Sequence, residues 1–207
     1  GKNVITIKEL RRFCGQMVYI SSLIYTIRPF LPDLWAAMTV QDTRAPLNCI
    51  WRRQIQHVLA WVIPLLEGPK LERHYRLAIY QGFGPRVEIN LDASPWGIGG
   101  YIAVDGIPKS WFADFFSAAD IAILGIVIGS CASQQVVECL AALVALRSWA
   151  KEWLQVGTRI VVRSDSVSAL TIVIKLKTKA EAVGILAREL ALDISLACYE
   201  PSVVQHV

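Results

Sequence analysis

The spacing of apolar residues along the chain changes near residue 85. Before that point they recur every three or four positions, which is typical of amphipathic helices. After it they alternate with polar residues, as in Arg86-Val87-Glu88-Ile89-Asn90-Leu91, which is typical of a strand. Gly82-Phe83-Gly84-Pro85 lies at the change and resembles a linker. We therefore expect a mainly helical segment over 1–81 and a second domain over 86–207.

The first part of the chain carries clear helix signals. Thr6 and Glu9 have the spacing of a capping box, which predicts a helix from there to about Tyr25. Two prolines then interrupt the helical pattern. Two more helices are expected, from Asp33, which can serve as a cap, to Met38 and from Trp51 to Leu66.

The second part alternates strands and helices. Asp105-Gly106 is a two-residue hairpin turn, so 99–104 and 107–112 should pair and form a three-stranded meander with 86–91. The fold class that this pattern predicts is α/β, with a mixed five-stranded sheet and helices. The elements expected after the meander are a short strand over 123–128, a long helix over 134–154, a buried strand over 159–164, helices over 166–174 and 180–197, and a strand over 202–207.

Composition narrows the class of protein. Of the 207 residues 54% are apolar, yet the densest apolar stretches are shorter than the roughly 18 residues that a spanning helix needs. No secretory signal precedes them. The five cysteines form no pair at metal-ligand spacing, which favours reduced core thiols. We expect an intracellular protein of the cytoplasm or nucleus, neither secreted nor bound to a membrane.

The formal charge is unevenly distributed. Residues 1–85 hold 11 Lys and Arg against 5 Asp and Glu, a net charge of +6, whereas 86–207 hold 10 against 12, a net charge of −2. The basic part could bind a phosphate backbone, although a solvated basic face gives the same pattern.

Three acidic residues are candidates for a functional site. Asp92 follows the first strand of the meander, and a turn residue is the simpler interpretation of an Asp beside Ser and Gly. Glu138 shares a helix face with three alanines, so it should face the sheet, unless it only favours the helix N-terminus. Asp165 ends the buried strand, where a cap of the next helix is the simpler interpretation of an Asp taken alone.

Taken together, the three acids indicate a metal site. The expected layout puts Asp92 and Asp165 at the ends of strands that should be neighbours, with Glu138 on the helix over the sheet. Carboxylates that converge without a basic partner repel one another, which divalent cations relieve. Oxygen ligands favour Mg²⁺ or Mn²⁺.

These motifs resemble the ribonuclease H domain of retroelement reverse transcriptases. The resemblance covers roughly 86–207, and its motifs are Asp92-Ala93-Ser94 with Gly97-Ile98-Gly99-Gly100, Glu138-Cys139-Leu140-Ala141-Ala142-Leu143, and Arg163-Ser164-Asp165-Ser166. The segment before it, with Arg28-Pro29-Phe30-Leu31-Pro32-Asp33, more loosely resembles the thumb and connection of DIRS-like or Gypsy-like retrotransposon enzymes.

The resemblance implies a function. It implies hydrolysis of the RNA strand of RNA/DNA hybrids with two Mg²⁺ or Mn²⁺ ions held by Asp92, Glu138 and Asp165. It implies substrate contacts near Ser94, Trp96, Gly97 and Ser166, and as partners an RNA/DNA hybrid and the remainder of a reverse transcriptase polyprotein. A fourth carboxylate, typical of the family, is expected beyond Val207, so we expect weak cleavage by 1–207.

Three other interpretations remain open. A ribonuclease-H-like connection module would bind hybrid without cutting it, and a degenerate element copy would have lost the activity. An actin-like nucleotide-binding fold also uses an Asp before Gly-rich hairpins, although 207 residues are few for its two lobes.

Overall fold

In the computed structural model, the helical part and the strand-rich part of the chain form separate units. The structure describes residues 3–40, 44–67, 84–152, 158–178, 181–196 and 199–206. Contacts divide the chain into Gly1–Arg73 and His74–Val207. The linker predicted at 82–85 lies partly outside the described residues. The mixed α/β architecture expected from the sequence is confirmed.

The first unit is mainly helical, as predicted. The capping box forms, because the Thr6 hydroxyl accepts from the Glu9 N–H at 3.1 Å and Glu9 accepts from the Thr6 N–H at 3.1 Å. Core side chains include Cys14, Phe30 and Val58. The elements are β1 (Val4–Thr6), α1 (Ile7–Leu23), the 3-10 helix η1 (Tyr25–Phe30), α2 (Leu31–Thr39), β2 (Cys49–Trp51), η2 (Arg52–Gln54) and α3 (Gln56–Glu67).

Two expectations for this unit were wrong. Trp51 does not begin a helix but ends β2, which pairs with β1. The Gln54 side chain accepts from the Trp51 N–H at 2.8 Å and turns the chain, so α3 begins only at Gln56. Asp33 does not cap α2, because the helix begins two residues earlier, at Leu31. Pro32 fits the first turn, since the N–H that it lacks would have no partner there.

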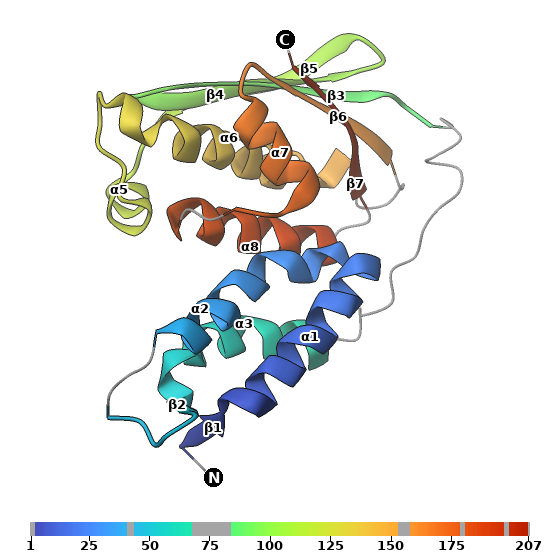
Figure 1. The fold of residues 1–207 in the computed structure, drawn as a ribbon. Helices are drawn as coiled ribbons and strands as arrows, with labels where there is room; N and C mark the ends of the chain where they lie inside the picture. Colours follow the sequence, from blue (N-terminus) through green and yellow to red (C-terminus); the bar gives the residue numbers. More distant parts are fainter. Residues whose placement is uncertain are drawn as a thin grey trace. The chain divides into compact units, whose positions relative to one another are not determined.

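The second unit is built on a five-stranded mixed sheet (Figure 1). The strand order is β5-β4-β3-β6-β7, with β3, β4 and β5 antiparallel and β6 and β7 parallel to β3. The first and fourth strands, β3 and β6, are thus neighbours, as predicted. The bounds are β3 (Val87–Ser94), β4 (Gly97–Val104), β5 (Ile107–Phe115), β6 (Thr158–Ser164) and β7 (Tyr199–His206).

Backbone conformation explains the hairpins. Asp105 and Gly106 have φ of 52° and 80°, and the predicted turn between β4 and β5 is confirmed. The first strand was predicted to end at Leu91, but β3 continues to Ser94 because Asp92, Ala93 and Ser94 pair with Gly99, Ile98 and Gly97 of β4. Asp92 therefore lies within a strand and not in a turn.

Helices cover one face of this sheet, and Figure 1 shows α6 (Gln134–Ser148) and α7 (Val167–Lys175) beneath it. The helix α8 (Glu181–Leu196) packs against α6. Ala141, Ala142 and Ala145 of α6 are buried, and α6 packs on β3 and β4. Among the residues that the structure describes, no helix is long and apolar enough to cross a bilayer.

The strand predicted over 123–128 was wrong. Ser117 and Asp120 form a second capping box that starts α5 (Ala118–Leu124), and Gly125 ends it with φ of 62°. The long helix ends at Ser148 and continues as a 3-10 turn, η4 (Ala150–Glu152). The rest of the predicted helix, 153–154, lies outside the described residues.

Candidate functional site

Asp92 and Asp165 lie at the same end of two neighbouring parallel strands. The register pairs Val87 with Ile160 and Asn90 with Arg163. Asp92 lies in β3 two residues beyond this last pair, and Asp165 directly follows the end of β6, so both acids lie at the same edge of the sheet. Both carboxylates are exposed, and neither has a hydrogen-bond or ion-pair partner among the described residues. No described side chain therefore compensates these two negative charges.

Glu138 is tied to the same end of the sheet through Gln134. The Gln134 amide nitrogen donates to the Ala93 carbonyl at 2.8 Å and to the Glu138 carboxylate at 2.8 Å. Ala93 follows Asp92 in β3, so one side chain connects the strand carrying Asp92 to the helix carrying Glu138. Glu138 is half-buried, as expected for a residue on the face that α6 turns toward the sheet.

Local structure removes two of the simpler explanations for these acids. The cap of α7 is Ser166, whose hydroxyl accepts from the Ala169 N–H at 3.2 Å, so Asp165 is not the cap. Glu138 is the fifth residue of α6, and the first turn of this helix holds no acidic residue. Since the helix dipole acts within the first turn, it does not account for Glu138.

The side chains nevertheless do not form a closed ligand set. Within the described ranges, no group of three or more His, Cys, Asp or Glu side chains could hold a metal ion as they stand. Asp92 is exposed on the face opposite to its buried neighbours Ile89 and Leu91, whereas Glu138 approaches from the helix side. The structure brings the three positions to one end of the sheet without gathering their oxygen atoms.

The residues predicted to contact substrate have structural roles in the turn between β3 and β4. The Ser94 hydroxyl accepts from the N–H groups of Trp96 and Gly97 at 3.3 Å and 3.2 Å. A Cβ on Gly97 would lie 2.5 Å from the Asp114 carbonyl oxygen, so the strand pairing requires glycine. Trp96 is 58% exposed, which leaves its ring accessible beside this turn.

A neighbouring loop holds this turn in place. The Gly129 N–H donates to the Pro95 carbonyl at 3.0 Å, and the buried Ser133 hydroxyl accepts from the Val127 N–H at 2.9 Å. Ser133 directly precedes Gln134, so the same packed loop positions the turn and the start of α6. Contacts with substrate at Ser94, Trp96, Gly97 and Ser166 stay predictions.

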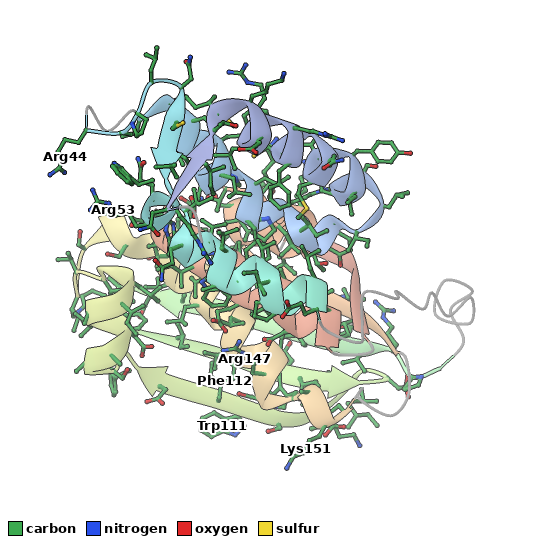
Figure 2. All side chains as sticks on the ribbon, turned by 90° about the horizontal axis from the view of Figure 1, so that it is seen from below. Arg44, Arg53, Trp111, Phe112, Arg147 and Lys151 are labelled. Carbon is green, nitrogen blue, oxygen red and sulfur yellow. The ribbon has the colours of Figure 1, made fainter. Side chains whose placement is uncertain are left out.

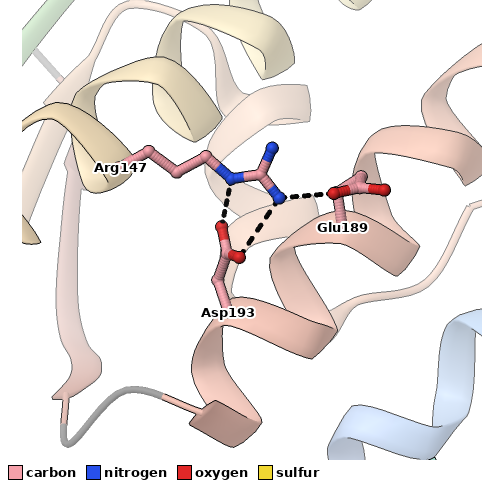
Figure 3. A network of polar contacts seen from close by, with 3 residues as sticks. All are labelled: Arg147, Glu189 and Asp193. Carbon is pink, nitrogen blue, oxygen red and sulfur yellow. Dashed lines mark hydrogen bonds and ion pairs between the residues drawn. The ribbon is translucent and has the colours of Figure 1, made fainter. Parts of the chain in front are cut away.

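Two later acids are engaged elsewhere, as Figure 3 shows. Asp193 accepts from Arg147 Nε at 2.7 Å, and Glu189 pairs with the same guanidinium. The hydrogen bond that Arg147 donates to Asp193 is the main cause of the raised pKa of Arg147, and the bond to Glu189 adds to it. These contacts fasten α8 to α6, so neither Glu189 nor Asp193 is available to add to the candidate carboxylates Asp92, Glu138 and Asp165.

Gln134 is the site residue that sequence reasoning missed. The available signal was its spacing, because Gln134 lies four residues before Glu138 and therefore on the same helix face. Its second partner, the Ala93 carbonyl, could not be foreseen from spacing.

Comparison with known proteins gives a limited result. No family model matches the chain. No curated protein matches it either. Among solved structures, it is similar to foamy virus protease-reverse transcriptase in complex with an RNA/DNA hybrid, with 15% identity, a TM-score of 0.37, and coverage of 97% of this chain and 26% of the other. It is also similar to the dRH form of the foamy virus protein in complex with double-stranded DNA. Here the identity is 15%, the TM-score is 0.33, and the match covers 91% of this chain and 34% of the other. The chain thus spans about a quarter to a third of the length of these proteins.

Proposed function

We propose that the second unit is a ribonuclease H domain of a retroelement reverse transcriptase and hydrolyses the RNA strand of RNA/DNA hybrids with divalent cations. The observation that carries the proposal is that Asp92, near the end of β3, and Asp165, directly after the neighbouring parallel strand β6, lie at the same end of the sheet, with Glu138 linked to this end by Gln134. The meander followed by a helix and a neighbouring parallel strand is the order expected for this domain.

The donor atoms suit an oxygen-preferring cation. Asp92 and Asp165 are accessible and unpaired with any described residue, and Glu138 presents one oxygen to a neutral amide rather than to a cation. In this proposal the three carboxylates hold Mg²⁺ or Mn²⁺, two ions in all. Bound ions would supply charge neutralisation at the scissile phosphate and an acidified water.

The protein's own residues then have defined roles. Gln134 orients Glu138 and holds the end of β3, so the Glu138 carboxylate keeps its position. The two exposed aspartates would face the substrate. Because the Ser94 hydroxyl and the N–H groups of Trp96 and Gly97 bond to one another within the turn, discrimination for RNA would rely on the Trp96 ring, which can lie against sugars.

One observation favours a non-catalytic alternative. The oxygen atoms of the three acids are not gathered into a ligand set within the described ranges. A module that binds hybrid without cutting it would tolerate this arrangement, since binding needs positive charge and shape more than metal ligands.

The proposed function is tested by the choice of substrate. The same labelled strand is offered as RNA in an RNA/DNA hybrid, as double-stranded RNA and as DNA duplex, each with Mn²⁺ and with chelator. The proposal expects fragments only from the RNA of the hybrid and only with the metal. Binding of hybrid without fragments supports the non-catalytic module, and ATP binding without hybrid binding supports the actin-like alternative.

For the first unit we propose a role in holding the hybrid, as the thumb and connection of such an enzyme. Several of its described cations are exposed, among them Lys8, Arg11, Arg12 and Arg52. They belong to α1 and η2, whose neighbours β1 and β2 pair with each other. A phosphate backbone is the complementary partner for such a group of charges. The remainder of the polyprotein is the second proposed partner.

A further inference from the structure

The outer strand β5 leaves one side of the sheet unpaired. Among the described residues its only strand neighbour is β4. All of β5 is exposed apart from Phe112, which is half-buried. Trp111 and Phe115 are 75% and 81% exposed, which is unusual for large aromatic side chains. Trp111 and Phe112 are labelled in Figure 2.

The direction of the free backbone groups follows from the glycines of β4. A Cβ on Gly97 would meet the Asp114 carbonyl oxygen at 2.5 Å, and a Cβ on Gly99 would meet the Phe112 carbonyl oxygen at 3.5 Å. The carbonyl groups of Phe112 and Asp114 therefore point toward β4. Because successive residues of a strand point their backbone groups to opposite sides, those of Trp111, Ala113 and Phe115 point outward.

Most of the features that protect this edge lie in the first half of β5. Pro108 lacks an N–H, Lys109 carries a charge, and the register shifts between Ile102 and Ala103 of the partner strand. Proline, lysine and bulges are devices that discourage pairing at sheet edges. The half from Ser110 to Phe115 has neither Pro nor Lys. A hollow of about 450 Å³ beside it, lined by Phe112, Leu140 and Val144 among others, lies open along this edge.

We propose that this edge binds a second copy of the chain, strand β5 pairing antiparallel with the partner's β5 about a two-fold axis at Ala113. This register joins the outward backbone groups of both strands. It places Trp111 opposite the partner's Phe115, and Phe115 opposite the partner's Trp111, so two aromatic pairs form at once. The smallest side chain, Ala113, faces its own copy on the axis.

The size of the surface is consistent with a reversible dimer. Four exposed aromatic side chains would bury on the order of 600 Å² in total, about half of the surface that specific interfaces bury at the low end. Pro108 and Lys109 fall outside the paired segment. The Asp114 carboxylate accepts from the Phe115 N–H at 2.8 Å, so it occupies one outward donor and weakens the pairing.

The oligomeric state tests this inference. Sedimentation over about two decades of protein concentration should show the mass rising from 23.0 kDa toward twice that value. Ala113→Pro and Trp111→Lys should keep the circular dichroism spectrum and remain monomeric, since Ala113 donates no bond to β4. Asp114→Ala should dimerise at about tenfold lower concentration, because its shielding carboxylate and a like charge are gone.

Cross-linking fixes the register. Residues that face each other in a hydrogen-bonded antiparallel pair have Cα atoms about 5.5 Å apart, within disulfide range. In a background where exposed Cys131 is replaced by Ser, Ala113→Cys should form a covalent dimer under mild oxidation, whereas Lys109→Cys should not. A monomer at every concentration, a dimer that survives Ala113→Pro, or equal cross-linking at both positions would overturn the proposal.

Discussion

Gln134 and Glu138 form a hydrogen bond of 2.8 Å on the first turns of α6, and the same amide nitrogen also donates to Ala93 of β3. The helix and the central strand are thereby joined beside Asp92. A carboxylate that accepts this bond keeps a fixed position relative to the strand end.

Gln134→Ala should therefore lower activity more than it lowers stability. The carbonyl of Ala93 loses its donor, which costs about 1 kcal/mol of unfolding free energy. Loss of a residue that orients a metal ligand typically costs about ten- to a hundredfold in metal affinity or rate. Denaturant titration and the Mn²⁺ dependence of cleavage measure the two effects. Gln135→Ala, an exposed neighbour, is the matched control and should change neither.

Gly97→Ala should destabilise the second unit. Its Cβ would lie 2.5 Å from the Asp114 carbonyl oxygen, which is backbone and must shift, at a cost of about 1–3 kcal/mol. Gly15→Ala is the opposite control, because Gly15 lies inside α1 and a Cβ there would meet no neighbouring atom. This substitution should raise the free energy of unfolding by about 0.5–1 kcal/mol. Thermal unfolding of the two variants should shift in opposite directions.

Divalent cations should raise the melting temperature. Asp92 and Asp165 lie at the same end of two neighbouring strands, β3 and β6, without a described cationic partner. A cation that binds the native state relieves their repulsion and stabilises the fold by mass action. Differential scanning fluorimetry with millimolar Mn²⁺ should show an upward shift that chelator reverses. The shift should vanish in Asp92→Asn. An equal shift in the variant would mean that the cation binds elsewhere.

Binding of hybrid should weaken steeply with salt. Each phosphate contact contributes about 0.9 to the slope of log K against log salt on B-form duplexes, and a similar dependence is expected here. Replacing both Arg11 and Arg12 by Ala should lower this slope. Lys151→Ala, an exposed lysine of the second unit, should leave it unchanged. Fluorescence anisotropy across a salt series gives the slopes, and identical slopes would exclude α1 from the interface.

Sequence periodicity predicted most elements because their signals are local. The capping box at Thr6, the turn at Asp105-Gly106 and the buried strand before Asp165 each depend on neighbouring residues. The failures arose where a longer-range contact decided the structure. Trp51 carries a helical apolar pattern, yet pairing of β2 with β1 holds it in a strand.

For the candidate site, too, local sequence patterns predicted the positions of the residues but not their longer-range contacts. The positions of Asp92, Glu138 and Asp165 followed from the order of strands and helices, whereas the bond from Gln134 to the Ala93 carbonyl required the packed geometry of α6 on β3. The cap of α7 is likewise Ser166 and not Asp165, although the sequence pattern around Asp165 alone favoured a cap there.

The central claim is tested most directly by the rate at which the RNA strand of an RNA/DNA hybrid is cleaved with Mn²⁺. This rate is compared among the native chain and the variants Asp92→Asn, Asp165→Asn and Asp105→Asn. The last variant makes the same chemical change at the turn between β4 and β5, where Asn also suits the positive φ. The account predicts that Asp92→Asn and Asp165→Asn retain the native melting temperature within a few degrees but cleave about a hundredfold or more slowly, while Asp105→Asn cleaves at the native rate. Equal rates for all four proteins would contradict it.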